Sequence, residues 1–425
     1  MLIKRIGKFA LLLVLLLSLA FLPACDDEET GTPGNGTNGD ENGEGSGEKV
    51  TITIGNLTDQ TGVAAQTLAM IDAALKDIVE YYNDNELIPG VRFRIVEYDT
   101  QYDSAKAIPG YQKLKSDGAD FIWTPVTLAV PVLKPRLDRD KFVAFTATAN
   151  MKKEELNGGY VFSLGITPEN EAYTLMEWIA ENDEDFPADR PAKIGGAAWD
   201  DGYSNLVFSA AKDYADAHPE LYDWDKSFLT EFGFNWTVQA EELKDCDYVF
   251  IPIPPHIFIR DYVAAGGNAK FLGTDPALAF TREIGKTGLW DEVDGSLFLR
   301  SSRWYNETGE IIDLTNQLLD EKHSESEAKA YRQQGCTYIS IKNLYIMLDI
   351  VKETVERYGA ENFNSETLYE TATSWQFEYD GIPDFNNFTE TKRIAQNYYA
   401  VYEASAAVEN IVRAHEDWIP EVESP

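Results

Sequence analysis

Hydrophobic and polar positions alternate with two different periods in the first part of the chain. Residues 50–57 (VTITIGNL) and 91–99 (VRFRIVEYD) alternate at every second position, which is typical of β-strands. Between them, residues 64–82 carry hydrophobic side chains at helical spacing, and a second helix is predicted over 104–116, before the apolar run 121–123. Because strands and helices follow one another through short loops, the pattern predicts a parallel, doubly wound α/β sheet.

The same alternation resumes further along the chain. Further strands are predicted at 160–165, 192–199, 247–253, 270–273 and 295–300, with helices at 169–181 and 204–217. The chain then reads as mostly helical from 306 to 373, as short strands from 376, and as a polar tail at its end. Two successive α/β units imply two lobes with a cleft between them.

Threonines gather where two neighbouring strands of the first unit end. Thr124 and Thr127 follow the strand at 121–123, and Thr146 and Thr148 follow the next apolar run. The carboxyl ends of parallel strands lie side by side, and open α/β sheets bind ligands there. Hydroxyls beside helix N-termini suit a carboxylate or another polar anion. The alternative is that these threonines only cap helices and occupy strands.

Composition and charge exclude some classes of binding partner. The 425 residues are 44% hydrophobic and 12% aromatic, which is ample for packed cores of two domains. The net charge is -36, with 72 acidic and 36 basic residues, which argues against nucleic acid and against anionic lipid surfaces. The acidity suits a domain repelled from the membrane, or life in high salt.

The start of the chain predicts export. Lys4, Arg5 and Lys8 precede a short apolar run that ends in Leu22-Pro-Ala-Cys25. A basic segment followed by a short apolar core is typical of a secretory signal, here residues 1–24. The small residues before Cys25 resemble the lipobox of bacterial lipoproteins, in which the Cys is acylated after cleavage; the alternative is an ordinary signal peptide. Residues 25–48 are acidic and Gly-rich, which predicts a flexible tether.

Several segments together resemble one family. IGNLTDQTGVAAQT, IWTPVT, FTATAN, WDDGYSNL, FLGTDPAL and QFEYDG, in this order over residues 50–402, resemble the leucine/isoleucine/valine-binding branch of type I periplasmic binding proteins, the substrate-binding lipoproteins of ABC importers. The resemblance implies two doubly wound α/β lobes joined by a three-strand hinge. It assigns residues 50–166 and 302–377 to lobe one, residues 167–301 and 378–402 to lobe two, and residues 403–425 to a C-terminal tail.

The resemblance also implies ligand contacts in lobe one, where hydroxyls and backbone amides of the family grip a carboxylate. Thr127 stands where the family has a Ser or Thr after a Gly-Pro turn, and Thr124 replaces the Gly. In FTATAN, the family hydroxyl corresponds to Thr148 or Thr146, or in a third register the position is Ala149.

In lobe two, Tyr203 matches a Tyr that closes over the ligand, and Asp275 matches the acid that pairs with an α-ammonium. Asp275 is also a good helix cap, and Tyr203 could simply pack. Trp123 lies unusually close to the implied pocket, and residues 251–256 (IPIPPH) replace a Gly-rich turn of the family. Both departures would permit a larger, aromatic or non-amino-acid solute, with His256 either contacting it or lying at the surface.

Signatures of enzymes and of metal sites fail on inspection. Gly285-Lys-Thr lacks the preceding Gly of a phosphate loop, because Phe280 occupies that position. The chain has no G-x-S-x-G and no H-E-x-x-H sequence, and the calcium-like start at Asp223 has Phe228 where the loop needs Gly. No cofactor, metal or catalytic residue is predicted. Cys246 and Cys336 are expected as buried thiols, a single bridge being the alternative, although the resemblance places them in different lobes.

Together with the lipobox, the family resemblance implies a monomeric, lipid-anchored receptor on the outer face of the cytoplasmic membrane. It would bind a small molecule, an amino acid or a relative such as a branched-chain amino acid, and deliver it to an ABC permease by hinge closure. The alternative is a sensor that binds a solute and signals through a partner.

Overall fold

The computed structural model describes residues 49–335 and 337–425. The expected signal peptide, the acylated Cys25, the tether and Cys336 lie outside these residues. Cys246 is a buried free thiol. Within the described part of the chain, no helix has the length and apolar character needed to cross a bilayer.

The first sheet has five parallel strands in the order β2-β1-β3-β4-β5. The strands are β1 (Val50–Thr58), β2 (Val91–Asp99), β3 (Phe121–Thr124), β4 (Ala144–Thr146) and β5 (Val161–Ser163). The helices between them are α1 (Ala65–Asp84), α2 (Ala107–Ser116) and α3 (Val130–Asp140). The strand–helix alternation predicted for this part of the chain is confirmed.

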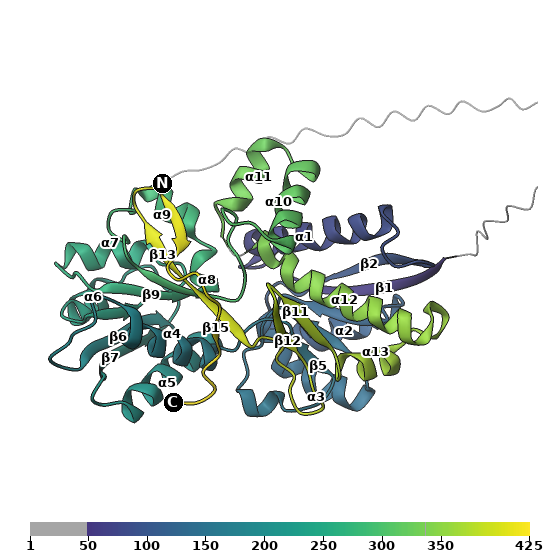
Figure 1. The fold of residues 1–425 in the computed structure, drawn as a ribbon, viewed down its shortest axis with the longest axis horizontal. Coiled ribbons are helices and arrows are strands. Elements are labelled where there is room, and N and C mark those ends of the chain that lie inside the picture. The colour runs from purple at the N-terminus through teal and green to yellow at the C-terminus, as the bar shows by residue number, and fades with distance from the viewer. Residues whose placement is uncertain (1–48, 336) are drawn as a thin grey trace, which may run out of the picture. The chain divides into compact units, whose positions relative to one another are not determined.

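The second sheet forms a separate half of Figure 1 and has the order β14-β13-β10-β9-β8-β6-β7. Its parallel strands are β6 (Ala192–Trp199), β7 (Tyr222–Thr230), β8 (Tyr248–Phe250), β9 (Lys270–Thr274) and β10 (Leu297–Arg300). Its helices are α4 (Pro168–Asn182), α5 (Gly202–Ala217), α6 (Thr237–Leu243), α7 (His256–Ala264), α8 (Asp275–Leu278) and α9 (Thr281–Thr287). Two lobes of the expected α/β class are therefore present.

After β10 the chain returns to the first lobe. The returning helices are α10 (Glu310–Lys322), α11 (Glu325–Arg332), α12 (Ile341–Tyr358) and α13 (Ser365–Ala372). Helices α10 and α12 pack against α1, as Figure 1 shows. A hairpin of β11 (Gln376–Tyr379) and β12 (Ile382–Asn387) follows, and β13 (Tyr398–Ser405) then joins the second sheet antiparallel to β10. The chain thus passes between the sheets three times, after β5, β10 and β12.

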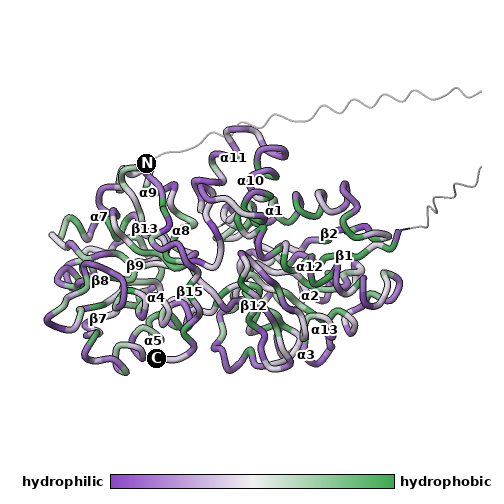
Figure 2. The backbone as a smooth tube through the Cα atoms, viewed as in Figure 1, coloured by the Kyte–Doolittle hydropathy of each residue, from purple (hydrophilic) through white to green (hydrophobic). Residues whose placement is uncertain are grey.

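The two faces of the first sheet bury different helices. Ile54, Phe121 and Trp123 belong to the hydrophobic cluster that contains α1 and α12, whereas Leu57 and Ile122 belong to the cluster that contains α2 and α3. Successive strand residues point to opposite faces, so this division follows from the two-residue period of the strands. Figure 2 shows hydrophobic and hydrophilic residues alternating along the covering helices, as one-sided burial requires.

Two parts of the second lobe differ from the sequence prediction. The expected polar tail from 403 is instead packed: β13 extends to Ser405, β14 (Asn410–Arg413) pairs with it, and β15 (Ile419–Pro420) pairs with its beginning. Strand β7 was not predicted at all. It lies at the edge of the sheet and is mostly exposed beyond Tyr222, and the charged and polar run Asp225-Lys226-Ser227 interrupts its hydrophobic alternation.

Candidate functional site

The carboxyl ends of the strands carry the polar residues in both lobes. In the first lobe these are the segments after β1, β2, β3 and β4, and in the second lobe the segments after β6, β9 and β10. Asp201 begins α5 there, where its carboxylate accepts a hydrogen bond from the amide of Ser204 at 2.8 Å. The threonine clusters predicted from the sequence lie at these strand ends.

Three of the four predicted threonine hydroxyls donate to the backbone. Thr124 donates to the carbonyl of Leu57 at 2.8 Å, and Thr148 donates to the carbonyl of Ile166 at 2.7 Å. Thr146 donates to the carbonyl of Thr148 at 2.6 Å. A hydroxyl has a single proton, so in this conformation none of the three has one left for a carboxylate. Their hydroxyls hold loops in place and offer only lone pairs to a ligand.

Thr127 is placed differently from the other threonines. It is partly exposed, and its hydroxyl forms a hydrogen bond with Tyr102, which follows β2. Burial raises the pKa of Tyr102, and the charges of Asp201 and Asp59 add to that rise. Because Asp201 belongs to the second lobe, Tyr102 and Thr127 lie on the side of the first lobe that faces the second. Tyr102 was not predicted as a site residue, although its position shortly after the end of β2 was a signal that could have identified it.

Tyr203 joins two partners in the second lobe. Its hydroxyl lies 2.6 Å from a carboxylate oxygen of Glu171 and 2.5 Å from the hydroxyl of Thr274. Glu171 is fully buried, and burial raises its pKa well above the ordinary value, with a further rise from Asp275 and an opposing effect from Tyr203. Its other oxygen has no hydrogen-bond partner among the described residues. The sequence reasoning found Tyr203 but missed Glu171.

Asp275 forms an ion pair inside the protein. Its carboxylate lies 2.6 Å from the guanidinium of Arg300, whose side chain is 0% exposed. Lys342 on α12 approaches the same corner and donates to the carbonyl of Ser301 at 2.9 Å and to the side chain of Gln396 at 2.6 Å. Burial is the main reason that the pKa of Lys342 falls to about 7; the charge of Asp275 opposes this fall and that of Arg300 contributes to it.

The charge of Asp275 is compensated within the protein. Burial raises the pKa of Asp275, while Arg300 and Lys342 lower it. Since Arg300 already neutralises Asp275, no ammonium from outside is required to compensate the carboxylate. The sequence reasoning missed both Arg300 and Lys342. Arg300 could have been noticed, because it is the only charged residue of the apolar strand LFLR. Lys342 lies inside a helix, where no sequence pattern distinguishes it.

Trp123 lies inside the first lobe. The side chain is fully buried in the cluster with α1 and α12, and its indole N–H has no hydrogen-bond partner among the described residues. In this conformation the ring presents no surface to a solute.

The two lobes approach each other at Asn150 and Gly202. A Cβ atom added to Gly202 would lie 3.5 Å from the Cβ of Asn150, which is ordinary van der Waals contact. The loop after β4 therefore lies close to the start of α5 in the other lobe. Among residues 49–335 and 337–425, no three His, Cys, Asp or Glu side chains are grouped so as to hold a metal ion.

The chain is similar in sequence to one protein family and in fold to several solved structures. A sequence model of the family described as periplasmic binding protein matches residues 51–408, which include both sheets. No curated protein sequence matches the chain.

Solved structures share the fold at low sequence identity. A branched-chain amino acid ABC transporter protein from Thermus thermophilus with bound valine is 17% identical, with a TM-score of 0.73 over 88% of this chain and 97% of that one. A fatty acid ABC transporter substrate-binding protein from Thermomonospora curvata is 18% identical, with a TM-score of 0.68 over 88% and 93%. A solute-binding protein from R. palustris in complex with 4-hydroxybenzoate is 14% identical, with a TM-score of 0.69 over 87% and 97%.

Proposed function

The chain belongs to the periplasmic binding protein family, and on that premise we propose that it is a lipid-anchored receptor that delivers an amino acid or a related small polar solute to an ABC importer. The family consists of extracytoplasmic solute-binding proteins and not of enzymes. The observation that carries the proposal is the match over residues 51–408, because it includes both lobes and all three connections between them.

The ligand would bind between the strand ends of the two lobes. Thr127 and Tyr102 would contact it from the first lobe, and Tyr203 and Asp275 from the second, since each is partly exposed and follows the end of a strand. Thr124, Thr146 and Thr148 would hold the surrounding loops. Binding to both lobes at once stabilises the closed form by its differential affinity, and the permease would recognise that form.

A carboxylate is the group that the corner formed by Asp275, Arg300 and Lys342 would attract. Arg300 balances Asp275, the pKa of Glu171 is raised, and Lys342 adds part of a positive charge near neutral pH. The corner is therefore neutral to positive, and its field favours an anionic group. The solutes named for two of the similar structures, valine and 4-hydroxybenzoate, both carry a carboxylate.

Titration calorimetry with matched solutes tests this assignment. Valine is compared with 3-methylbutanoate, and phenylalanine with 3-phenylpropanoate, because each pair differs only by the α-ammonium. We expect at least one pair to bind, with its two members within about tenfold of each other, which is about 1.4 kcal/mol. A strong preference for the amino acid that disappears in Asp275→Ala would restore the ammonium role of Asp275. The absence of binding by any solute would refute the proposal.

Anchoring through Cys25 has its own test. In cells that process lipoproteins, the chain is expected in the membrane fraction and Cys25→Ala in the soluble fraction. Equal fractionation of the two would refute the anchor and leave solute binding untouched.

A further inference from the structure

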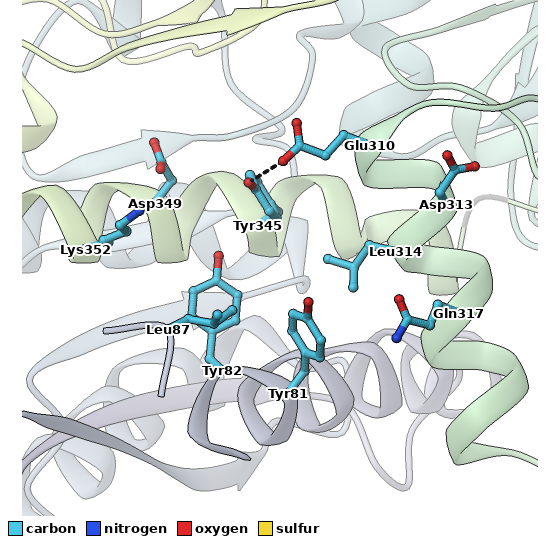
Figure 3. A pocket seen from close by; sticks show the side chains of 10 residues that line it. All are labelled: Tyr81, Tyr82, Leu87, Glu310, Asp313, Leu314, Gln317, Tyr345, Asp349 and Lys352. Carbon is cyan, nitrogen blue, oxygen red and sulfur yellow. Dashed lines mark hydrogen bonds between the residues drawn. The ribbon is translucent and has the colours of Figure 1, made fainter. Parts of the chain in front are cut away.

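A cavity opens in the first lobe at a distance from the strand ends that carry the candidate site. It lies between α1, α10 and α12 and has a volume of about 410 Å³ (Figure 3). Its α1 residues, Tyr81 and Tyr82, belong to the last turn of that helix, from which the chain leads into the beginning of β2. The cavity therefore lies toward the amino ends of the strands, and none of the candidate ligand residues lines it.

Three tyrosines form the aromatic part of the wall. Tyr81 and Tyr82 come from α1, and Tyr345 comes from α12 on the opposite side, as Figure 3 shows. The rings of Tyr81 and Tyr82 are 6.3 Å apart with an interplanar angle of 71°, so one ring turns its edge where the other turns its face. Aromatic faces attract cations, because the ring quadrupole is negative there.

Tyr82 supplies a polar group without a partner. The residue is only 6% exposed, yet its hydroxyl makes no hydrogen bond to any described residue. Figure 3 shows this hydroxyl pointing from α1 into the space below α12. Because this hydroxyl opens onto the cavity and is not engaged by the protein, it can form a hydrogen bond with a molecule that enters.

The charged residues of the wall are predominantly acidic. Glu310, Asp313 and Asp349 face a single basic residue, Lys352, which is 45% exposed and 3.9 Å from Glu356. Tyr345 donates to Glu310 at 3.2 Å. In a chain of net charge -36, acidic residues alone say little about a site. Here they accompany an aromatic wall and a free hydroxyl in one cavity.

We propose that this cavity binds a small organic ammonium ion, separately from the solute of the cleft. The tyrosine faces would receive the alkyl groups and the positive charge, and the carboxylates would balance that charge. The volume lies within the range of ligand pockets, roughly 300–1,000 Å³. Lys352 would move toward Glu356 as the cation enters.

Titration calorimetry of the wild-type protein tests the proposal with two matched pairs of probes. Choline is compared with 3,3-dimethyl-1-butanol, and n-butylammonium with n-butanol, since the members of each pair differ mainly in charge. We expect at least one cation to bind at least tenfold more tightly than its neutral counterpart, and its affinity to fall as sodium chloride is raised. Neither cation binding better than its counterpart would overturn the proposal without the use of any variant.

Matched variants then test whether the cation binds in this cavity. Glu310→Gln combined with Asp313→Asn should weaken the cation at least fivefold. Asp320→Asn combined with Glu325→Gln removes the same charge from α10 and α11 outside the cavity and should change the affinity less than twofold. Equal losses in the two double variants would show that the cation responds to net charge alone and would overturn the site.

Discussion

The guanidinium of Arg300 lies 2.6 Å from the carboxylate of Asp275, with no part of the Arg300 side chain exposed. The guanidinium also lies 4.6 Å over the ring of Trp304. The acid that the sequence assigns to a ligand ammonium thus already has a cation of the protein beside it. Removing either member would leave the other buried and uncompensated, which costs far more than an exposed pair is worth.

Arg300→Met is therefore expected to lower the free energy of unfolding by about 3–5 kcal/mol. The matched control is Arg190→Met, because the pair of Arg190 with Asp247 is partly exposed and such pairs contribute little to stability. Urea unfolding measures both. Adding Asp275→Asn to Arg300→Met should recover part of the loss. Equal effects at the two positions would contradict the role of the buried pair.

Lys342 is expected to make stability depend on alkaline pH. Burial lowers its pKa from 10.5 to about 7, so between these values the unfolded chain binds a proton that the folded chain does not. The free energy of unfolding should then rise with pH from about 7 to 10.5, by at most about 1.4 kcal/mol per pH unit. Below pH 7, Lys342 is protonated in both the folded and the unfolded chain, so the full free-energy cost of burying its charge lowers the stability and no longer changes with pH.

The comparison with Lys342→Met isolates this effect. The difference in unfolding free energy, wild type minus variant, should rise across the alkaline window and be flat below pH 6. Asp275 and Arg300, which face the ammonium, remain in both proteins. Parallel curves for the two proteins would show that Lys342 keeps its ordinary pKa.

Ligand affinity should also depend on pH if the solute carries a carboxylate. The proton on Lys342 and the proton on Glu171, whose pKa is raised, both favour a nearby anion. Affinity is therefore expected to fall as pH rises from 6 to 8.5, and Lys342→Met should flatten the profile. Calorimetry at several pH values measures it, and Glu171→Gln separates the contribution of the glutamate. An affinity that rises with pH would contradict a carboxylate ligand.

Tyr203→Phe removes the hydroxyl that joins Glu171 and Thr274. Because Glu171 is buried, the loss should lower the unfolding free energy by about 1–3 kcal/mol and weaken ligand binding. Tyr214→Phe on the same helix is the control, since the Tyr214 side chain packs against Tyr173 and makes no hydrogen bond within the described chain. Thermal unfolding and calorimetry on both variants would decide. Equal losses would mean that Tyr203 only packs.

Trp418→Ala tests the packed end of the chain. The indole lies 4.7 Å from Phe385, donates to Asp380 at 2.7 Å, and has the guanidinium of Arg413 at 4.4 Å. We expect a loss of about 3 kcal/mol of unfolding free energy, as for other Trp truncations. Val408→Ala, in a turn and 58% exposed, should change it by less than about 0.5 kcal/mol. A Trp418→Ala protein as stable as wild type would restore the polar tail expected from the sequence.

The sequence predicted the helices and strands that bury one face, because their hydrophobic period is visible locally. It did not predict elements or residues whose role depends on contacts with distant parts of the chain. The helix at α1 and the strand at β1 show their periods locally, so both were found. In strand β7, at the edge of the sheet, the run Asp225-Lys226-Ser227 interrupts the alternation of hydrophobic residues, and β14 has only four residues, so neither has a strong local signal. Glu171 and Lys342 acquire their roles only when segments from different parts of the chain are brought together, which no local pattern records.

Gly202 offers a direct test of lobe closure. A Cβ there would touch the Cβ of Asn150 at 3.5 Å, so Gly202→Ala is expected to be tolerated, whereas the longer side chain of Gly202→Leu would meet the loop after β4. Gly202→Leu should therefore hold the lobes apart, weaken ligand binding at least tenfold and reduce the ligand-induced decrease in radius of gyration measured by small-angle X-ray scattering. Because Gly202 is exposed at the first turn of α5, the unfolding free energy should change little. An unchanged affinity in Gly202→Leu would show that ligand binding does not require the contact between Asn150 and the start of α5.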